Sequence, residues 1–69
     1  MNAKSKIKAA CAAAGVPMSE LAARLDMSPQ SLNQRAKVGR FTLEEWEQIA
    51  KALGAEWVGQ FVFEGGVII

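Results

Sequence analysis

The sequence has few of the residues on which most enzymes and metal sites depend. It contains no histidine and a single cysteine, Cys11, among 69 residues. Without histidine, serine–histidine and cysteine–histidine nucleophiles and histidine-containing zinc sites are excluded. One cysteine forms neither an internal disulfide nor a four-cysteine zinc site. We therefore expect no enzymatic activity, no metal, no cofactor and a reducing, cytoplasmic location.

Long apolar runs are also missing. The stretch Ala9 to Ala14 follows several lysines, but it is too short and too weakly apolar for a secretory core or a membrane span. A hydrophobic share of 51% with 22% charged residues is typical of a globular domain. The length leaves room for one small domain over residues 1–69 and none for a doubly wound or barrel enzyme. We infer neither a membrane nor a small-molecule ligand.

Charge is unevenly distributed along the chain. Residues 1–40 carry seven basic and two acidic side chains, a net +5, whereas residues 41–69 carry one basic and five acidic side chains, a net −4. Such polarity gives the molecule a directed field. Charge alone does not separate two explanations, namely chance segregation on a solvated surface and a first half that faces an anionic partner.

Apolar residues recur at helical spacing through the first 54 residues. The pattern predicts four helices, over residues 3–14, 18–25, 29–38 and 43–53. Ser28-Pro29 is a strong start for the third helix, because serine caps helices and proline suits their first position. Thr42 and Glu45 have the spacing of a capping box at the start of the fourth. Its predicted buried stripe is Leu43, Trp46, Ile49, Ala50 and Leu53.

After Gly54 the apolar period changes to two, which predicts a β-hairpin over residues 56–69 with its turn at Gly65-Gly66. Pairing across this turn would place Phe63 opposite Ile68 and Val62 opposite Ile69, leaving residues 56–61 unpaired. The expected fold is mainly α. It consists of four short helices that include a helix-turn-helix, followed by this hairpin.

An apolar strand with a free edge favours pairing with another chain. We therefore expect a two-fold homodimer through the hairpin. Its interface would contain Phe61, Val62, Phe63 and Ile68. Two copies joined in this way would hold their third helices about one DNA turn apart, ~34 Å. In the alternative, the hairpin aromatics only cover the helices of one monomer.

The predicted third helix has an amide-rich face opposite its core residues Leu32 and Ala36. That face carries Gln30, Asn33, Gln34 and Lys37. Amide side chains can make paired hydrogen bonds to adenine, and lysine can reach guanine O6 and N7. The face is therefore a candidate for base contacts in the major groove, although most helices have an ordinary solvated polar face. Phosphate contacts would come from the flanking residues Ser28, Arg35 and Arg40.

The segment from Gly15 to Leu32 resembles the helix-turn-helix of the Cro/phage-repressor (Xre-type) family. The resemblance rests on Glu20-Leu21-Ala22 in the second helix and Met27-Ser28 in the turn. Phe41-Thr42-Leu43-Glu44-Glu45 and Ile49-Ala50-Lys51-Ala52-Leu53-Gly54 resemble the next helix of the family, so the similarity covers roughly residues 3 to 54. It implies DNA binding, with Gln30 and Gln34 at base-contact positions and Arg40 in a loop on the DNA backbone.

The sequence departs from the family pattern at two places. Pro17 and Met18 stand where the family commonly has threonine and then a phosphate-binding glutamine, and Asp26 stands where it usually has glycine. Both departures reduce the attraction to DNA. We expect a sequence-specific double-stranded DNA-binding protein that regulates transcription. The alternative is a protein-interaction module or antitoxin-like accessory that uses its hairpin and binds DNA weakly or not at all.

Overall fold

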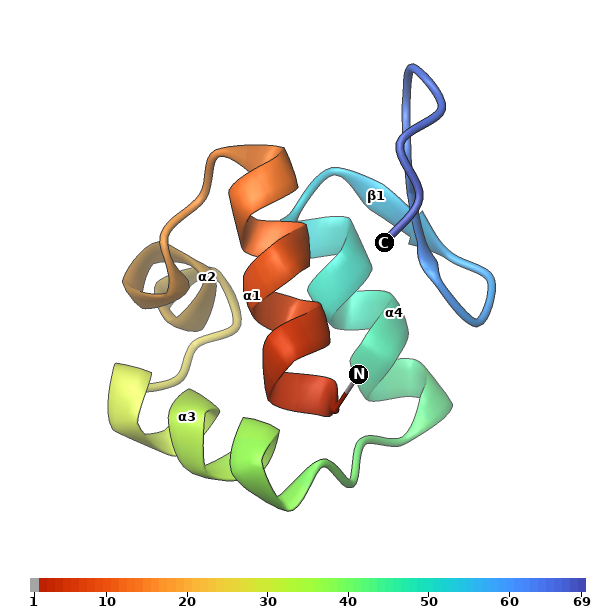
Figure 1. Ribbon diagram of the computed structural model, residues 1–69. Coiled ribbons are helices and arrows are strands. Elements are labelled where there is room, and N and C mark those ends of the chain that lie inside the picture. The colour runs from red at the N-terminus through yellow and green to blue at the C-terminus, as the bar shows by residue number, and fades with distance from the viewer. Residues whose placement is uncertain (1) are drawn as a thin grey trace.

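The computed structural model describes residues 2–69, which form four helices followed by a small antiparallel sheet. The elements are α1 (Ala3–Ala14), α2 (Met18–Arg24), α3 (Pro29–Val38), α4 (Leu43–Ala52), β1 (Ala55–Trp57) and β2 (Phe61–Phe63). In Figure 1, α1 lies in the middle of the helices and α3 lies at the bottom, while the hairpin rises at the upper right, away from α3. The predicted arrangement, mainly helical with a C-terminal hairpin, is confirmed.

Local hydrogen bonds fix where α3 and α4 begin, and a left-handed residue forms the turn before α3. The Ser28 hydroxyl accepts from the Ser31 backbone N–H at 3.1 Å, which starts α3 as predicted. Thr42 and Glu45 form both bonds of the predicted capping box, at 2.9 and 3.1 Å. Asp26, in the turn between α2 and α3, has a φ of 59°, the left-handed conformation that Asp tolerates better than most residues.

The core lies where the four helices meet, and the hairpin closes one side of it. Each helix contributes one buried alanine, and these small side chains let the helices approach closely. They are Ala10, Ala22, Ala36 and Ala50. Larger apolar side chains fill the space between them, namely Ile7, Leu21, Leu32, Ile49, Leu53 and Phe61.

The chain reverses at Gly65-Gly66 as predicted, but it also makes an earlier turn that the sequence pattern did not predict. The apolar alternation is interrupted at Gly59, where φ is 80°, and the chain reverses so that Trp57 pairs with Phe61. Glycine adopts this conformation without strain, which permits the turn. Residues 56–61, predicted to lack a partner, therefore supply most of β1 and the start of β2, which pair with each other.

The last residues of the chain pair with the other side of β2, in a register one residue away from the predicted one. Val62 lies opposite Ile68 rather than Ile69. Phe61 and Ile69 exchange two backbone hydrogen bonds, each 2.9 Å long. The predicted pairings of Val62 with Ile69 and of Phe63 with Ile68 are therefore wrong by one position.

Aromatic side chains attach the hairpin to α4. Trp57 stacks on Trp46 with ring centroids 4.6 Å apart and an interplanar angle of 5°. Phe61 meets both rings edge-on, at 4.9 and 5.8 Å, and has no exposed surface. Its predicted place in a dimer interface is therefore corrected, because its side chain belongs to the core of one chain. Phe63 packs against the same core.

One residue of the predicted α4 stripe faces solvent instead. Leu43 is 66% exposed, whereas Ile49 and Ala50 are buried. Leu43 is the first residue of α4, and it precedes the turns of the helix that contact the core.

Candidate nucleic-acid interface

The outward face of α3 carries the amide side chains that the sequence singled out. Leu32 and Ala36 are 1% and 2% exposed and face the core. Gln30 and Gln34, on the opposite side of the helix, are exposed. The helix α3 lies at the edge of the described part of the molecule (Figure 1), which agrees with the exposure of these side chains.

A groove of about 380 Å³ runs along the N-terminal half of α3. Ser28, Gln30 and Gln34 line it together with Ser31 and Arg35. Four of the predicted DNA-contacting residues therefore line one groove, from the cap through the second turn of α3: Ser28, Gln30, Gln34 and Arg35.

Two other predicted base-contact residues lie elsewhere on α3. Asn33 is half-buried on the flank of the helix, and Lys37 is exposed in its last turn. Lys37 follows Gln30 and Gln34 along the same helical stripe, so it extends the polar face toward the C-terminal end of α3. Asn33 has less surface to offer a partner.

Two residues of this face have no place in the predicted contact set. Ser31 lines the groove, and the Ser28 hydroxyl donates to its Oγ at 3.0 Å, which leaves the Ser31 hydroxyl proton to donate elsewhere. Val38 is 68% exposed at the end of α3 and could contact a thymine methyl group. Both lie on the flank marked by Gln34, since 31, 34 and 38 have helical spacing. Sequence reasoning that extended the stripe to that flank would have found them.

The three residues predicted to contact phosphate differ in whether their side chains already have partners within the chain. Arg40 is exposed in the loop between α3 and α4. The Ser28 hydroxyl is already engaged, because it accepts from the Ser31 N–H and donates to the Ser31 hydroxyl. Arg35 is turned toward α4, where it forms an ion pair with Glu45. Of these three, Arg40 is the residue best placed to meet a phosphate.

Acidic groups moderate the positive charge near α3. Glu44 and Glu45 stand in the first turn of α4, directly after the loop that carries Arg40. The Thr42 backbone hydrogen bond and then Arg35 lower the pKa of Glu45, so this carboxylate is charged at neutral pH. The uncompensated cations near α3 are therefore fewer than the +5 of the first 40 residues suggests.

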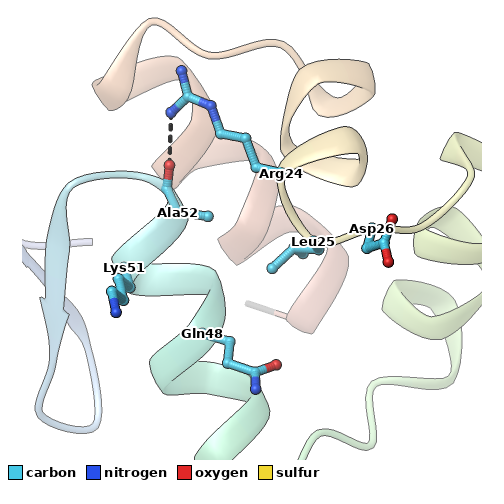
Figure 2. A pocket seen from close by; sticks show the side chains of 6 residues that line it. All are labelled: Arg24, Leu25, Asp26, Gln48, Lys51 and Ala52. Atoms are coloured by element: carbon cyan, nitrogen blue, oxygen red, sulfur yellow. Dashed lines mark hydrogen bonds between the residues drawn. The ribbon is translucent and has the colours of Figure 1, made fainter.

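Another hollow, of about 430 Å³, lies between α2 and α4. Figure 2 shows Arg24 reaching the Ala52 carbonyl at 2.7 Å, while Asp26 and Lys51 point away from it and from each other. Because these charges do not converge, the hollow has no arrangement that would bind an ion. Within residues 2–69, no group of three metal-ligating side chains comes together.

Cys11 is a buried core residue, and its surroundings do not activate its thiol as a nucleophile. It is 4% exposed, and burial raises the pKa of its thiol. Its Sγ lies 3.6 Å from the Met18 Sδ. The thiol is therefore protonated and shielded at neutral pH.

None of the known protein families, curated proteins or solved structures compared with this chain matches it. None of the helices in the described part of the chain has the length and apolar character needed to cross a membrane.

Proposed function

We propose that this protein binds double-stranded DNA sequence-specifically, as a transcriptional regulator without enzymatic activity. In this proposal α2, the turn and α3 act as a helix-turn-helix of the Cro/phage-repressor kind, and α3 enters the major groove. The observation that carries the proposal is the uncovered groove of α3, lined by Ser28, Gln30 and Gln34.

The chemistry of this face suits bases better than it suits phosphates alone. Gln30 and Gln34 each offer one amide donor and one carbonyl acceptor, the pattern that adenine N7 and N6 require. Lys37 can donate to guanine, and Arg40 supplies a cation for the backbone beside it. With few free cations, we expect moderate affinity and a shallow dependence on salt.

The direct test is selection of bound sequences from a random duplex pool, followed by anisotropy titration of the selected site. We expect Gln34→Ala, and separately Gln30→Ala, to lose about 1–3 kcal/mol of discrimination at one base pair. Gln60→Ala is the matched control, because Gln60 is exposed in the β1–β2 turn, away from α3. The assignment fails if selection yields no preferred site, or if both α3 variants discriminate like the control.

We also propose that two copies associate through the hairpin, with Val62 and Ile68 at the contact. Val62 and Ile68 lie opposite each other across the sheet, and Ile68 is 57% exposed. Val67 is 49% exposed beside it. The hairpin lies away from α3 (Figure 1), so a second copy there leaves the proposed DNA-contacting face uncovered.

Analytical ultracentrifugation at micromolar concentrations tests this association. We expect a species of twice the 7.4 kDa chain mass, and Ile68→Lys should convert it to monomer. A single 7.4 kDa species over the whole concentration range would contradict the dimer but not the proposed DNA binding.

The same exposed apolar residues favour a second candidate function, a protein-interaction module that binds a different partner through the hairpin. Val58, Val67 and Ile68 are 67%, 49% and 57% exposed. Retention on heparin at low salt supports the DNA-binding function. Absence of retention, together with reproducible co-purification of one protein that Ile68→Lys abolishes, supports the interaction module.

A further inference from the structure

Arg35 reaches across the gap between α3 and α4. Its Nη2 forms the ion pair with Glu45 and also donates to the Arg40 carbonyl at 3.4 Å. Its guanidinium carbon lies 5.3 Å from the centre of the Phe41 ring, within the range of a cation–π contact. One side chain of α3 therefore touches the connecting loop at two places and the first turn of α4.

Glu45 uses both of its carboxylate oxygens in this arrangement. Oε1 accepts from the Thr42 N–H at 2.9 Å, and Oε2 accepts from Arg35. The capping box thus holds the Glu45 carboxylate at the start of α4, and the same carboxylate binds Arg35 through its other oxygen. Phe41 in turn packs on Trp46 of α4, with centroids 4.9 Å apart.

A small pocket lies between α3 and α4 beside this pair. It is partly open, with a volume of about 50 Å³, with Leu32 on the α3 side and Ile49 on the α4 side, and the α2–α3 connection also lines it through Leu25 and Met27. Arg35, Phe41 and Glu45 line the same pocket. The Arg35–Glu45 ion pair and the Arg35–Phe41 contact therefore join α3, the loop and α4 at the rim of this pocket.

We propose that Arg35 and Glu45 are a positioning pair, which fixes α3 and the Arg40 loop against α4 in the orientation that DNA binding requires. The proposal rests on the DNA-binding function and assigns Arg35 to positioning rather than to phosphate contact. Arg35 holds the carbonyl of Arg40, so losing the pair would disturb the one flanking cation best placed for the backbone.

Glu45→Gln gives the sharpest test, because electrostatics and positioning predict opposite signs. Glutamine retains the capping box, whereas the charge pair with Arg35 is lost. Removing an acidic charge near DNA should tighten binding, but loss of positioning should weaken it by about two- to five-fold. Glu20→Gln is the matched control, since Glu20 pairs with Arg24 at 2.6 Å and Arg24 contacts α4 rather than α3.

The salt dependence of binding separates positioning from phosphate contact. Arg35→Gln should weaken binding while leaving the slope of log affinity against log salt unchanged. Arg40→Gln should flatten that slope by about 0.9, the loss of one phosphate contact. A slope that falls equally in both variants, or Glu45→Gln binding at least as tightly as Glu20→Gln, overturns the positioning role.

Hydrogen exchange tests the pair without DNA. Glu45→Gln and Arg35→Gln should each accelerate exchange of the α3 amides several-fold while leaving α1 unchanged, and Glu20→Gln should not affect α3. If the wild-type chain binds no duplex, the proposed function fails and exchange still decides whether the pair holds α3. Unchanged α3 exchange in both pair variants overturns the inference.

Discussion

Phe61→Ala should destabilise the chain more than other single substitutions in the hairpin. Phe61 has no exposed surface and contacts Trp46 and Trp57. A buried phenylalanine removes about 150–250 Å² from water, which at about 25 cal/mol per Å² is about 4–6 kcal/mol. Measured costs of such truncations are about 3–5 kcal/mol. A chain of 69 residues has a total stability of only about 3–10 kcal/mol.

Urea denaturation followed by tryptophan fluorescence measures this loss, because both tryptophans lie in the affected cluster. Phe61→Leu is the milder variant, with an expected cost of about 1–2 kcal/mol, so that a curve remains measurable if the alanine variant does not fold. Val58→Ala is the control, since Val58 is 67% exposed in the same hairpin and should change stability by about 0.5 kcal/mol or less. If Phe61→Ala lost less than about 1 kcal/mol, the packing of the hairpin on α4 would be refuted.

Three further predictions concern single side chains. Asp26→Gly should stabilise the chain by about 0–1 kcal/mol in urea denaturation, because glycine relieves the left-handed strain at φ 59° but costs entropy; a clear loss would contradict the turn geometry. Glu45, whose pKa is lowered chiefly by the Thr42 backbone hydrogen bond and next by Arg35, should contribute stability above about pH 4.3, the unfolded value, and lose it as the pH falls through its lower folded pKa. The stability of Glu45→Gln should consequently fall less steeply with acid, and parallel curves would contradict this. Cys11 should react with Ellman's reagent only as fast as the chain opens, and rapid reaction of the native protein would contradict its burial.

The helices follow from the sequence because their signals are local. Ser28 and Thr42 each satisfy an unpaired backbone N–H within three residues, so the start of α3 and of α4 is encoded next to the residue that caps it. Leu32 and Ala36 are four residues apart and share one side of α3, and Gln30 and Gln34 share the other side in the same way. This spacing fixes which face of α3 is outward. The amide face of the candidate interface was predictable for this reason.

The turn at Gly59 and the ion pair of Arg35 with Glu45 were not predictable in the same way. Gly59 fits an inward strand position as well as a turn, and the contacts of Phe61 with α4 decide between them. Arg35 lies ten residues from Glu45, and no helical or strand period joins positions across a loop. Both features depend on how separate elements pack, which a pattern along one element does not contain.

Titration of the isotope-labelled protein with its selected duplex, followed by nuclear magnetic resonance, tests the proposed role of α3 most directly. The side-chain amide signals of Gln30 and Gln34 should shift together with the backbone signals of Ser31, while those of Gln60 remain unchanged. Shifts confined to the hairpin, with the α3 amides unmoved at saturation, would contradict an α3 that enters the major groove.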